Sequence, residues 1–278
     1  MDKSRKILPV GISDFRKIIE EQYYFVDKSL LIKEIINSGA EVTLLTRPRR
    51  FGKTLNMNMI KLFFEKSEEE TASLFQGLKI WHCEDTEKYR CEQGKYPVVF
   101  LTLKDIKCDS WGETYEKLKN MIQLEYNRHA YLLQSECLTK FDRQYLGRIL
   151  NMDASDADWQ DSLNRLTGYL KAHYKTPAIL LIDEYDVPIQ QGHMLDYYDK
   201  VINFMRNWLS GGLKDNQNLK FAVLTGILHI AQESIFSGLN NLDVYTVLDK
   251  TYREYFGFTQ EEVDEIAAYY DCKEKSVE

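Results

Sequence analysis

The sequence predicts an α/β fold, with a parallel sheet of about five strands covered by helices on both faces. Short apolar runs alternate with longer segments in which apolar residues recur every three or four positions, a pattern typical of strands alternating with helices. The apolar runs show no polar alternation, which indicates strands buried on both faces of a parallel sheet. A long helical region at about 112–175 separates the second and third expected strands, so we expect a helical insertion there.

The expected elements can be placed in order along the chain. Apolar runs predict strands at about 42–46, 96–103, 178–182, 220–225 and 243–247. Apolar residues at helical spacing predict further helices at about 30–36, 53–66 and 195–209. Ser29 stands where its side chain could cap the helix that follows it. The polar stretch 82–95 and residues 185–192 are expected to be loops.

Three units are expected along the chain. Residues 1–40 form an N-terminal segment that packs on the core, 41–260 form the core domain with its helical insertion, and 261–278 begin a truncated C-terminal region. With 278 residues, 44% of them hydrophobic, the chain can bury one large core or two modest ones.

Charge and hydropathy restrict the function classes. The formal net charge is −7 and no long basic tail is visible, so a broad nucleic-acid surface is not indicated, although a local basic patch stays open. The basic residues between 47 and 53 stand out against this acidic background and favour a small anionic ligand. The charged start is followed by no long apolar stretch, so we expect neither a signal peptide nor a membrane span.

Cysteine and aspartate clusters indicate no metal centre of their own. The five cysteines are irregularly spaced without a CxxC pair, and His82, Cys83 and Cys91 match no common zinc spacing. Reduced thiols suit a reducing cytosol, so we expect a cytoplasmic protein. The Asp-rich patch at 153–161 lacks the glycine and final glutamate of a calcium loop, and it predicts a solvated helix start.

Residues 46–54 read Thr-Arg-Pro-Arg-Arg-Phe-Gly-Lys-Thr, directly after an apolar run. Backbone N–H groups before a helix form an anion-binding concavity, Lys53 can reach the β- and γ-phosphates, and the Thr54 hydroxyl can hold Mg²⁺. The run therefore predicts a phosphate-binding loop of the strand–Gly-x-x-x-x-Gly-Lys-Ser/Thr–helix kind. Arg47 replaces its first glycine, which removes conformational freedom from the turn, and Pro48 offers no N–H.

The rest of this loop is expected to contact the nucleotide as well. Phe51 and Gly52 lie between the loop cations and Lys53. Arg49 or Arg50 can pair with phosphate or with Asp186, and a structural ion pair is an equal alternative for these arginines.

Two carboxylates follow the apolar strand at 178–182. Ligands bind at the carboxyl ends of strands in α/β sheets, so Asp183 would sit near the metal and Glu184 would polarise the attacking water as a general base. A lone Asp-Glu at a strand end is more often a solvated loop. Its pairing with the phosphate loop favours a nucleotide site.

The strand at 220–225 ends in the polar residue Thr225. In P-loop ATPases with adjacent aspartate and glutamate, the next strand inserts between the other two and offers a polar residue that senses the γ-phosphate. Thr225 fits that role, and a threonine that simply ends a strand beside glycine is the equal alternative.

Several runs together resemble a known family, the bacterial AAA-ATPase-like proteins that usually carry a PD-(D/E)XK nuclease-like domain at the C-terminus. The resemblance covers about residues 7–260. It rests on the runs Leu-Pro-Val-Gly-Ile-Ser-Asp-Phe (8–15), Tyr-Phe-Val-Asp-Lys-Ser (24–29), Arg-Pro-Arg-Arg-Phe-Gly-Lys-Thr (47–54), Leu-Ile-Asp-Glu-Tyr-Asp (181–186) and Glu-Ser-Ile-Phe-Ser-Gly-Leu-Asn-Asn (233–241).

The resemblance implies ATP as ligand with Mg²⁺, and it places Tyr24, Asp27 and Lys28 near the adenine. It also implies a regulatory or defence-like role coupled to a nuclease domain or nucleic acid, and it leaves a homo-oligomer open. Two departures are expected to matter. The chain ends soon after residues 256–259, without nuclease residues, and His229 stands where the family would have arginine, which is longer and always charged.

The sequence thus predicts a Mg²⁺-dependent P-loop ATPase. Lys53 neutralises phosphate charge, Thr54 and Asp183 hold the metal, and Glu184 activates water. The alternative is a nucleotide-gated interaction module that binds ATP or ADP with little hydrolysis, which the altered loop and His229 favour.

Overall fold

A five-stranded parallel sheet forms the centre of the protein. The structure is a computed structural model, and it describes residues 5–227, 235–236 and 239–272. The strand order is β2-β3-β4-β1-β5, and every neighbouring pair is parallel. The strands are β1 (Val42–Thr46), β2 (Val98–Thr102), β3 (Ala178–Asp183), β4 (Leu219–Gly226) and β5 (Leu242–Tyr245). The predicted fold class is therefore confirmed.

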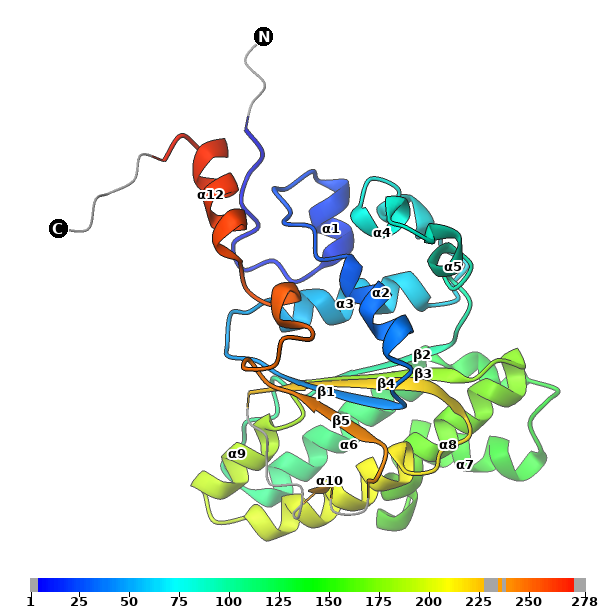
Figure 1. Cartoon of the computed structure of the whole chain (residues 1–278). Helices are drawn as coiled ribbons and strands as arrows, with labels where there is room; N and C mark the ends of the chain where they lie inside the picture. The colour runs from blue at the N-terminus through cyan, green and yellow to red at the C-terminus, as the bar shows by residue number, and fades with distance from the viewer. Residues whose placement is uncertain (1–4, 228–234, 237–238, 273–278) are drawn as a thin grey trace.

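Helices cover both faces of the sheet (Figure 1). One face carries α1 (Phe15–Glu20), α2 (Leu30–Ser38), α3 (Lys53–Phe64), α4 (Lys79–His82) and α5 (Thr86–Arg90). The other carries α6 (Trp111–Arg128), α7 (Lys140–Leu150), α8 (Asp156–Tyr174), α9 (Val187–Met194) and α10 (Tyr198–Leu213). Single-turn helices η1 (Ala72–Leu74), η2 (Ala130–Gln134) and η3 (Arg253–Tyr255), and the helix α12 (Gln260–Tyr269), complete the described elements.

The strands are mainly apolar because they contribute side chains to two hydrophobic cores. In β3, Leu180 and Ile182 point into the core beneath α6, α8 and α10, whereas Ile179 and Leu181 point into the core beneath α1 to α5. Successive side chains of a strand face opposite sides, so a strand covered on both faces has no polar alternation. The expected helical insertion is α6, η2, α7 and α8, between β2 and β3.

Strand β4 lies between β1 and β3, as expected from the order of the motifs. Leu45 of β1 is paired with Thr225 of β4, and Ile182 of β3 is paired with Leu224. The three strands therefore end side by side at one edge of the sheet.

Three local predictions differ from the structure. The expected loop at 185–192 contains most of α9, because Pro188 suits a first helical turn and Val187 and Ile189 are buried. The expected loop at 82–95 contains α5. Ser29 does not cap α2 with its side chain; it is itself helical in conformation, and its hydroxyl accepts a hydrogen bond from the Ile80 N–H.

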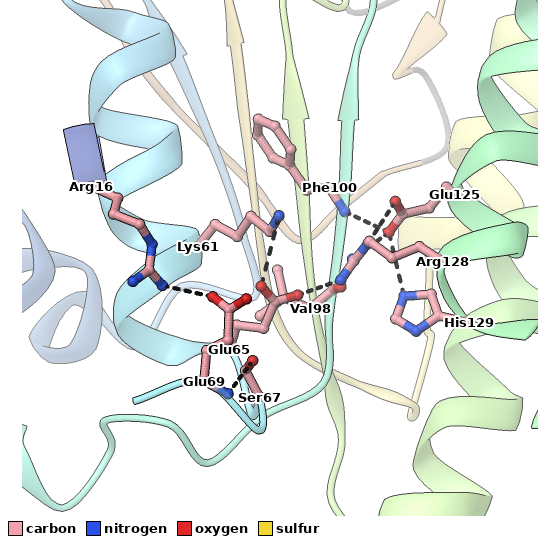
Figure 2. Close-up of polar contacts among 10 residues, drawn as sticks. All are labelled: Arg16, Lys61, Glu65, Ser67, Glu69, Val98, Phe100, Glu125, Arg128 and His129. Atoms are coloured by element: carbon pink, nitrogen blue, oxygen red, sulfur yellow. Dashed lines mark hydrogen bonds and ion pairs between the residues drawn. The ribbon is translucent and has the colours of Figure 1, made fainter. Parts of the chain in front are cut away.

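Strand β2 lies at one edge of the sheet, and side chains form hydrogen bonds with its exposed backbone groups, as Figure 2 shows. Glu125 on α6 accepts the Phe100 N–H at 3.0 Å, and Arg128 donates to the Val98 carbonyl. Arg128 also pairs with Glu125 at 2.6 Å and with Glu65 at the end of α3. We call Glu65, Glu125 and Arg128 the edge clip. It joins α3 and α6 around the edge strand and takes the place of a further strand there.

The two ends of the described chain lie against each other beside α3 (Figure 1). Lys28 pairs with Glu262 of α12 at 2.6 Å and donates to the Glu254 carbonyl at 2.5 Å. Tyr24 packs on Tyr269, with ring centroids 4.8 Å apart. The five cysteines are free thiols. No helix within the described part of the chain is long and apolar enough to cross a membrane.

Candidate nucleotide-binding site

The loop between β1 and α3 is a tight turn that ends at a helix N-terminus. Gly52, with φ of 77°, precedes the first helical residue Lys53, and Arg50 also has a positive φ of 67°. The Arg47 N–H donates to the Gly226 carbonyl at 2.9 Å, which ties the start of the loop to the end of β4. The unpaired N–H groups of the first turn of α3 can therefore bind an anion.

Lys53 lies folded onto this loop. It is only 4% exposed, and its Nζ donates to the carbonyls of Arg47 and Pro48, each at 3.1 Å. Burial lowers the pKa of Lys53, and the carboxylates of Glu184 and Asp183 oppose that effect. The ammonium thus sits inside the loop and beside two anions, where phosphate oxygens could replace the loop carbonyls as its partners.

Asp183 is held by hydroxyl groups from two other elements. Its Oδ2 accepts a hydrogen bond from Thr54 of α3 at 2.7 Å, and its Oδ1 accepts one from Thr225 of β4 at 2.5 Å. The aspartate is fully buried at the end of β3. Residues far apart in sequence therefore meet at one carboxylate because β1, β3 and β4 end together.

Glu184 is next to Asp183 but is held differently. Its φ of 54° is unusual for a residue with a side chain, and its N–H donates to the Thr225 hydroxyl at 3.3 Å. Burial, and then the charge of Asp183, raise its pKa, whereas Lys53 lowers it. Such a turn aims a half-buried carboxylate away from the strand, and backbone strain of this kind gathers at functional sites.

Gly226 leaves space for the turn that carries these carboxylates. A Cβ at this position would lie 2.7 Å from the Tyr185 ring and 3.0 Å from Asp186 Oδ1. Asp186 is fully buried and accepts hydrogen bonds from the Ile227 N–H at 2.9 Å and from Gln190 at 2.6 Å. The end of β4 thereby positions the carboxylate turn.

The donor set suits magnesium better than a metal with an all-protein cage. Within the described residues no group of three or more His, Cys, Asp or Glu side chains could hold a metal. Mg²⁺ uses few protein oxygens and takes its other ligands from water and phosphate. Thr54 and Asp183, whose oxygens are 2.7 Å apart, can supply those protein oxygens.

A mainly apolar cavity of about 160 Å³ opens beside the loop. Its lining includes Leu8, Tyr24, Lys28, Phe51, Tyr255 and Phe258. Of the residues expected near the adenine by resemblance, Tyr24 and Lys28 line this cavity. Asp27 has a different place, because its carboxylate accepts hydrogen bonds from the N–H groups of Ser29 and Lys79.

The structure thus brings together Lys53, Thr54, Asp183, Glu184 and Thr225. The remaining predicted loop residues, Arg49, Arg50, Phe51 and Gly52, are exposed on the same turn. His229 lies outside the described residues.

Residues 255–257 contact the phosphate loop and α3, and nothing in the sequence indicates these contacts. Asn56 donates to the Tyr255 carbonyl at 2.7 Å, the Phe51 carbonyl accepts the Gly257 N–H at 3.1 Å, and Phe256 packs on the loop. These contacts join positions about 200 residues apart. No local pattern could have indicated them.

The strand order of the sheet is that of the core of P-loop nucleoside triphosphatases, which is the class of fold to which the protein belongs. Comparison with known families gives the more particular answer. Residues 9–236 match the AAA-ATPase-like family, described as "Predicted AAA-ATPase". This match covers most of the chain, which therefore belongs to that family. The family implies ATP binding and suggests nucleoside-triphosphatase activity.

A curated relative supports this assignment. The chain is 28% identical over 267 residues to the "Uncharacterized protein in vnfD 5'region" of Azotobacter chroococcum mcd 1. The match covers 95% of this chain and 45% of that protein, so the chain spans about half the length of its relative. No solved structure matches.

Proposed function

We propose that this chain binds ATP with Mg²⁺ at the loop between β1 and α3 and hydrolyses it. The observation that carries the proposal is the meeting of Thr54, Asp183 and Thr225 through hydrogen bonds of 2.7 and 2.5 Å, directly beside the buried Lys53. Hydroxyl, carboxylate and ammonium groups at a helix N-terminus suit a metal-bound triphosphate and few other ligands.

Each residue has a distinct proposed task. Lys53 leaves the loop carbonyls and neutralises phosphate charge, and Thr54 and Asp183 hold the metal, which neutralises charge that develops on the phosphates. Glu184 takes a proton from the attacking water, a task that its raised pKa favours. Thr225 holds both Asp183 and the Glu184 N–H, so it positions the two carboxylates, and sensing of the γ-phosphate remains a prediction.

The cavity beside the loop is the proposed base pocket. Aromatic and apolar side chains, among them Tyr24 and Phe51, line it, and a purine ring can stack on such a surface. Arg49 and Arg50 are proposed to contact phosphate from the exposed side of the loop. The arginines are free to do so because both are exposed to solvent.

A second candidate is a nucleotide-gated interaction module that hydrolyses little. The closed site favours it: Lys53 is engaged by loop carbonyls, and both oxygens of Asp183 already have hydroxyl partners. Nucleotide binding would then rearrange the site without rapid chemistry.

For the biological role we propose regulation or defence-like action in the cytoplasm, coupled to a nuclease-like domain or a nucleic acid. Support comes from the family resemblance and from a relative about twice as long as this chain. Assembly into a homo-oligomer belongs to the same proposal.

Calorimetry with ATP and Mg²⁺ tests the binding site. Lys53→Ala should weaken binding by about 100-fold or more, because the variant loses the buried ammonium that faces the phosphates. Lys66→Ala is the matched control, since Lys66 lies beyond the end of α3 and its Nζ packs on the Tyr174 ring. Equal affinities in wild type and Lys53→Ala would refute the phosphate-loop assignment. Phosphate release with and without DNA then separates the ATPase from the gated module.

A further inference from the structure

The residue that replaces the first glycine of the phosphate loop is buried rather than exposed. Arg47 is only 2% exposed. Its Nη1 donates to the carbonyl of Thr46 and to that of Tyr245, each at 2.8 Å. The first partner belongs to β1 and the second ends β5, so one guanidinium joins the carboxyl ends of two neighbouring strands.

The same guanidinium also contacts a segment near the C-terminal end of the described chain. It lies 5.0 Å from the centroid of the Phe256 ring, within the range of a cation–π contact. The residues on either side of Phe256 are bound to the phosphate loop and to α3. Gly257 donates its N–H to the Phe51 carbonyl at 3.1 Å, and the Tyr255 carbonyl accepts from Asn56 at 2.7 Å.

We propose that Arg47 is a positioning residue, which clamps the phosphate loop to the end of β5 and to residues 255–257. The proposal rests on the proposed nucleotide function for its effect on affinity. A glycine at this place gives a phosphate loop conformational freedom. With arginine in place of glycine, the backbone of this loop has less conformational freedom, and contacts with β5 and residues 255–257 fix its conformation.

Arginine suits this task for physical reasons. Its planar guanidinium can donate to two carbonyls at once and stack on an aromatic face, whereas a lysine ammonium offers a single charged point. Burial lowers the pKa of Arg47, and the charge of Asp249 raises it, so the site contains a partial counter-charge. Nη1 of Arg47 is held by two carbonyls and the guanidinium lies on the Phe256 ring, whereas Nη2 is buried without a hydrogen-bond partner among the described residues. The contacts of Nη1 and the ring suit a structural role.

The clamp has a consequence beyond the loop. Residues 255–257 lead directly into α12, which is tied to the N-terminal segment by the ion pair of Lys28 and Glu262 at 2.6 Å. A change in the loop on nucleotide binding is therefore passed to residues 255–257 and α12 as a change in the same set of contacts.

Hydrogen exchange of the nucleotide-free protein tests the clamp directly. Arg47→Gly restores the standard glycine, and exchange in residues 252–258 should become about tenfold faster or more, because charge-assisted contacts are lost. Arg49→Gly changes an exposed cation of the same loop and should leave that exchange unchanged. Arg47→Lys should fall between wild type and Arg47→Gly. Should Arg47→Gly fail to fold, Phe256→Leu removes the contact between the guanidinium and the ring while a buried apolar side chain stays at this position, and it should also speed exchange in the loop.

Nucleotide affinity gives a second and separable readout. Arg47→Gly should bind ATP with Mg²⁺ about tenfold more weakly, although it matches the standard motif better. The proposed clamp would be wrong if hydrogen exchange at residues 252–258 had the wild-type rate in both Arg47→Gly and Arg47→Lys, and if both variants bound nucleotide as tightly as wild type or more tightly. If exchange is faster in Arg47→Gly but the wild-type protein binds no nucleotide, the clamp is supported and the proposed function is rejected.

Discussion

At the scale of single residues, the neighbours Asp183 and Glu184 have different surroundings. Asp183 is fully buried and has hydroxyl partners on both oxygens, which leaves it one orientation. Glu184 is half-buried at a positive φ and has a raised pKa. A fixed carboxylate suits a metal ligand, and a more basic one suits proton transfer.

We therefore expect conservative substitutions at these two positions to fail differently. Glu184→Gln keeps its size but cannot accept a proton, so ATP should bind normally while turnover falls by about 10²–10⁴-fold. Asp183→Asn removes a negative charge beside the metal and should weaken binding of ATP with Mg²⁺ by about tenfold or more. Calorimetry and phosphate release measure the two effects. If Glu184→Gln hydrolyses ATP as fast as an active wild type, the assignment of the base is wrong.

At the scale of elements, α3 connects the two polar centres of the protein. Its first residues, Lys53 and Thr54, lie in the nucleotide site, and Glu65 at its other end belongs to the edge clip. The helix of 12 residues spans about 18 Å between them. The clip thus stabilises the far end of the helix that presents its N-terminus to phosphate.

Because of the edge clip, the free energy of unfolding should depend on pH in the acid range. Burial alone would raise the pKa of Glu125, but the neighbouring side chains of His129, 3.4 Å away, and Arg128, which donates hydrogen bonds to it, hold the pKa at about 2, below the ordinary value of about 4.3. The folded state therefore prefers the ionised carboxylate, and its contribution is present above about pH 4.5 and lost as pH falls towards 2.

Urea denaturation between pH 7 and pH 2 measures this contribution. Wild type should lose on the order of 3 kcal/mol more than Glu125→Gln across that range, because the variant has no carboxylate to protonate. Glu116→Gln is the control, since Glu116 is an exposed carboxylate on the same helix. Identical pH dependence in wild type and Glu125→Gln would mean that the clip does not stabilise the folded state through this charge.

At the scale of the whole molecule, the phosphate loop is a junction of the fold. It contacts β4 through Arg47 and Gly226, and β5 and residues 255–257 through the contacts already described. A ligand that binds this junction therefore contacts a loop that is bonded to several elements of the fold. Nucleotide binding should therefore stabilise the whole protein.

Thermal unfolding with ATP and Mg²⁺ measures that stabilisation. At a ligand concentration about 100 times the Kd, linkage adds about 2.7 kcal/mol to the free energy of unfolding, and the Tm should rise by about 5–10 °C. Lys53→Ala, with an affinity about 100-fold weaker, should gain only about 0.4 kcal/mol at the same ligand concentration, and its Tm should rise by no more than about 1–2 °C. An equal rise in both proteins would place the bound nucleotide at another site.

The kind of sheet could be predicted from the sequence, and so could the residues that meet at the candidate site. An apolar run such as that of β3 suits only a strand that is covered on both faces of a sheet. The phosphate loop, the strands and the carboxylates can also be ordered along the chain from the sequence. Lys53 and Thr54 were predicted from the Gly-Lys-Thr motif of the loop after β1, and Asp183, Glu184 and Thr225 from their places at or just after the end of a strand. The structure brings these residues together, and their roles in nucleotide binding stay predictions. Such features can be predicted because they depend on residues that are close together in the sequence.

The contacts between segments that lie far apart in the sequence could not be predicted, because they depend on how whole elements pack. Arg47 reads as a loop cation in sequence, yet it is buried because its partner Tyr245 lies 198 positions away. The edge clip likewise joins Arg128 to Glu65 across 63 positions. Ser29, which a local pattern presents as a helix cap, instead accepts a hydrogen bond from Ile80, 51 positions away. Such pairings depend on the packing of whole elements, and a pattern among near neighbours carries no record of them.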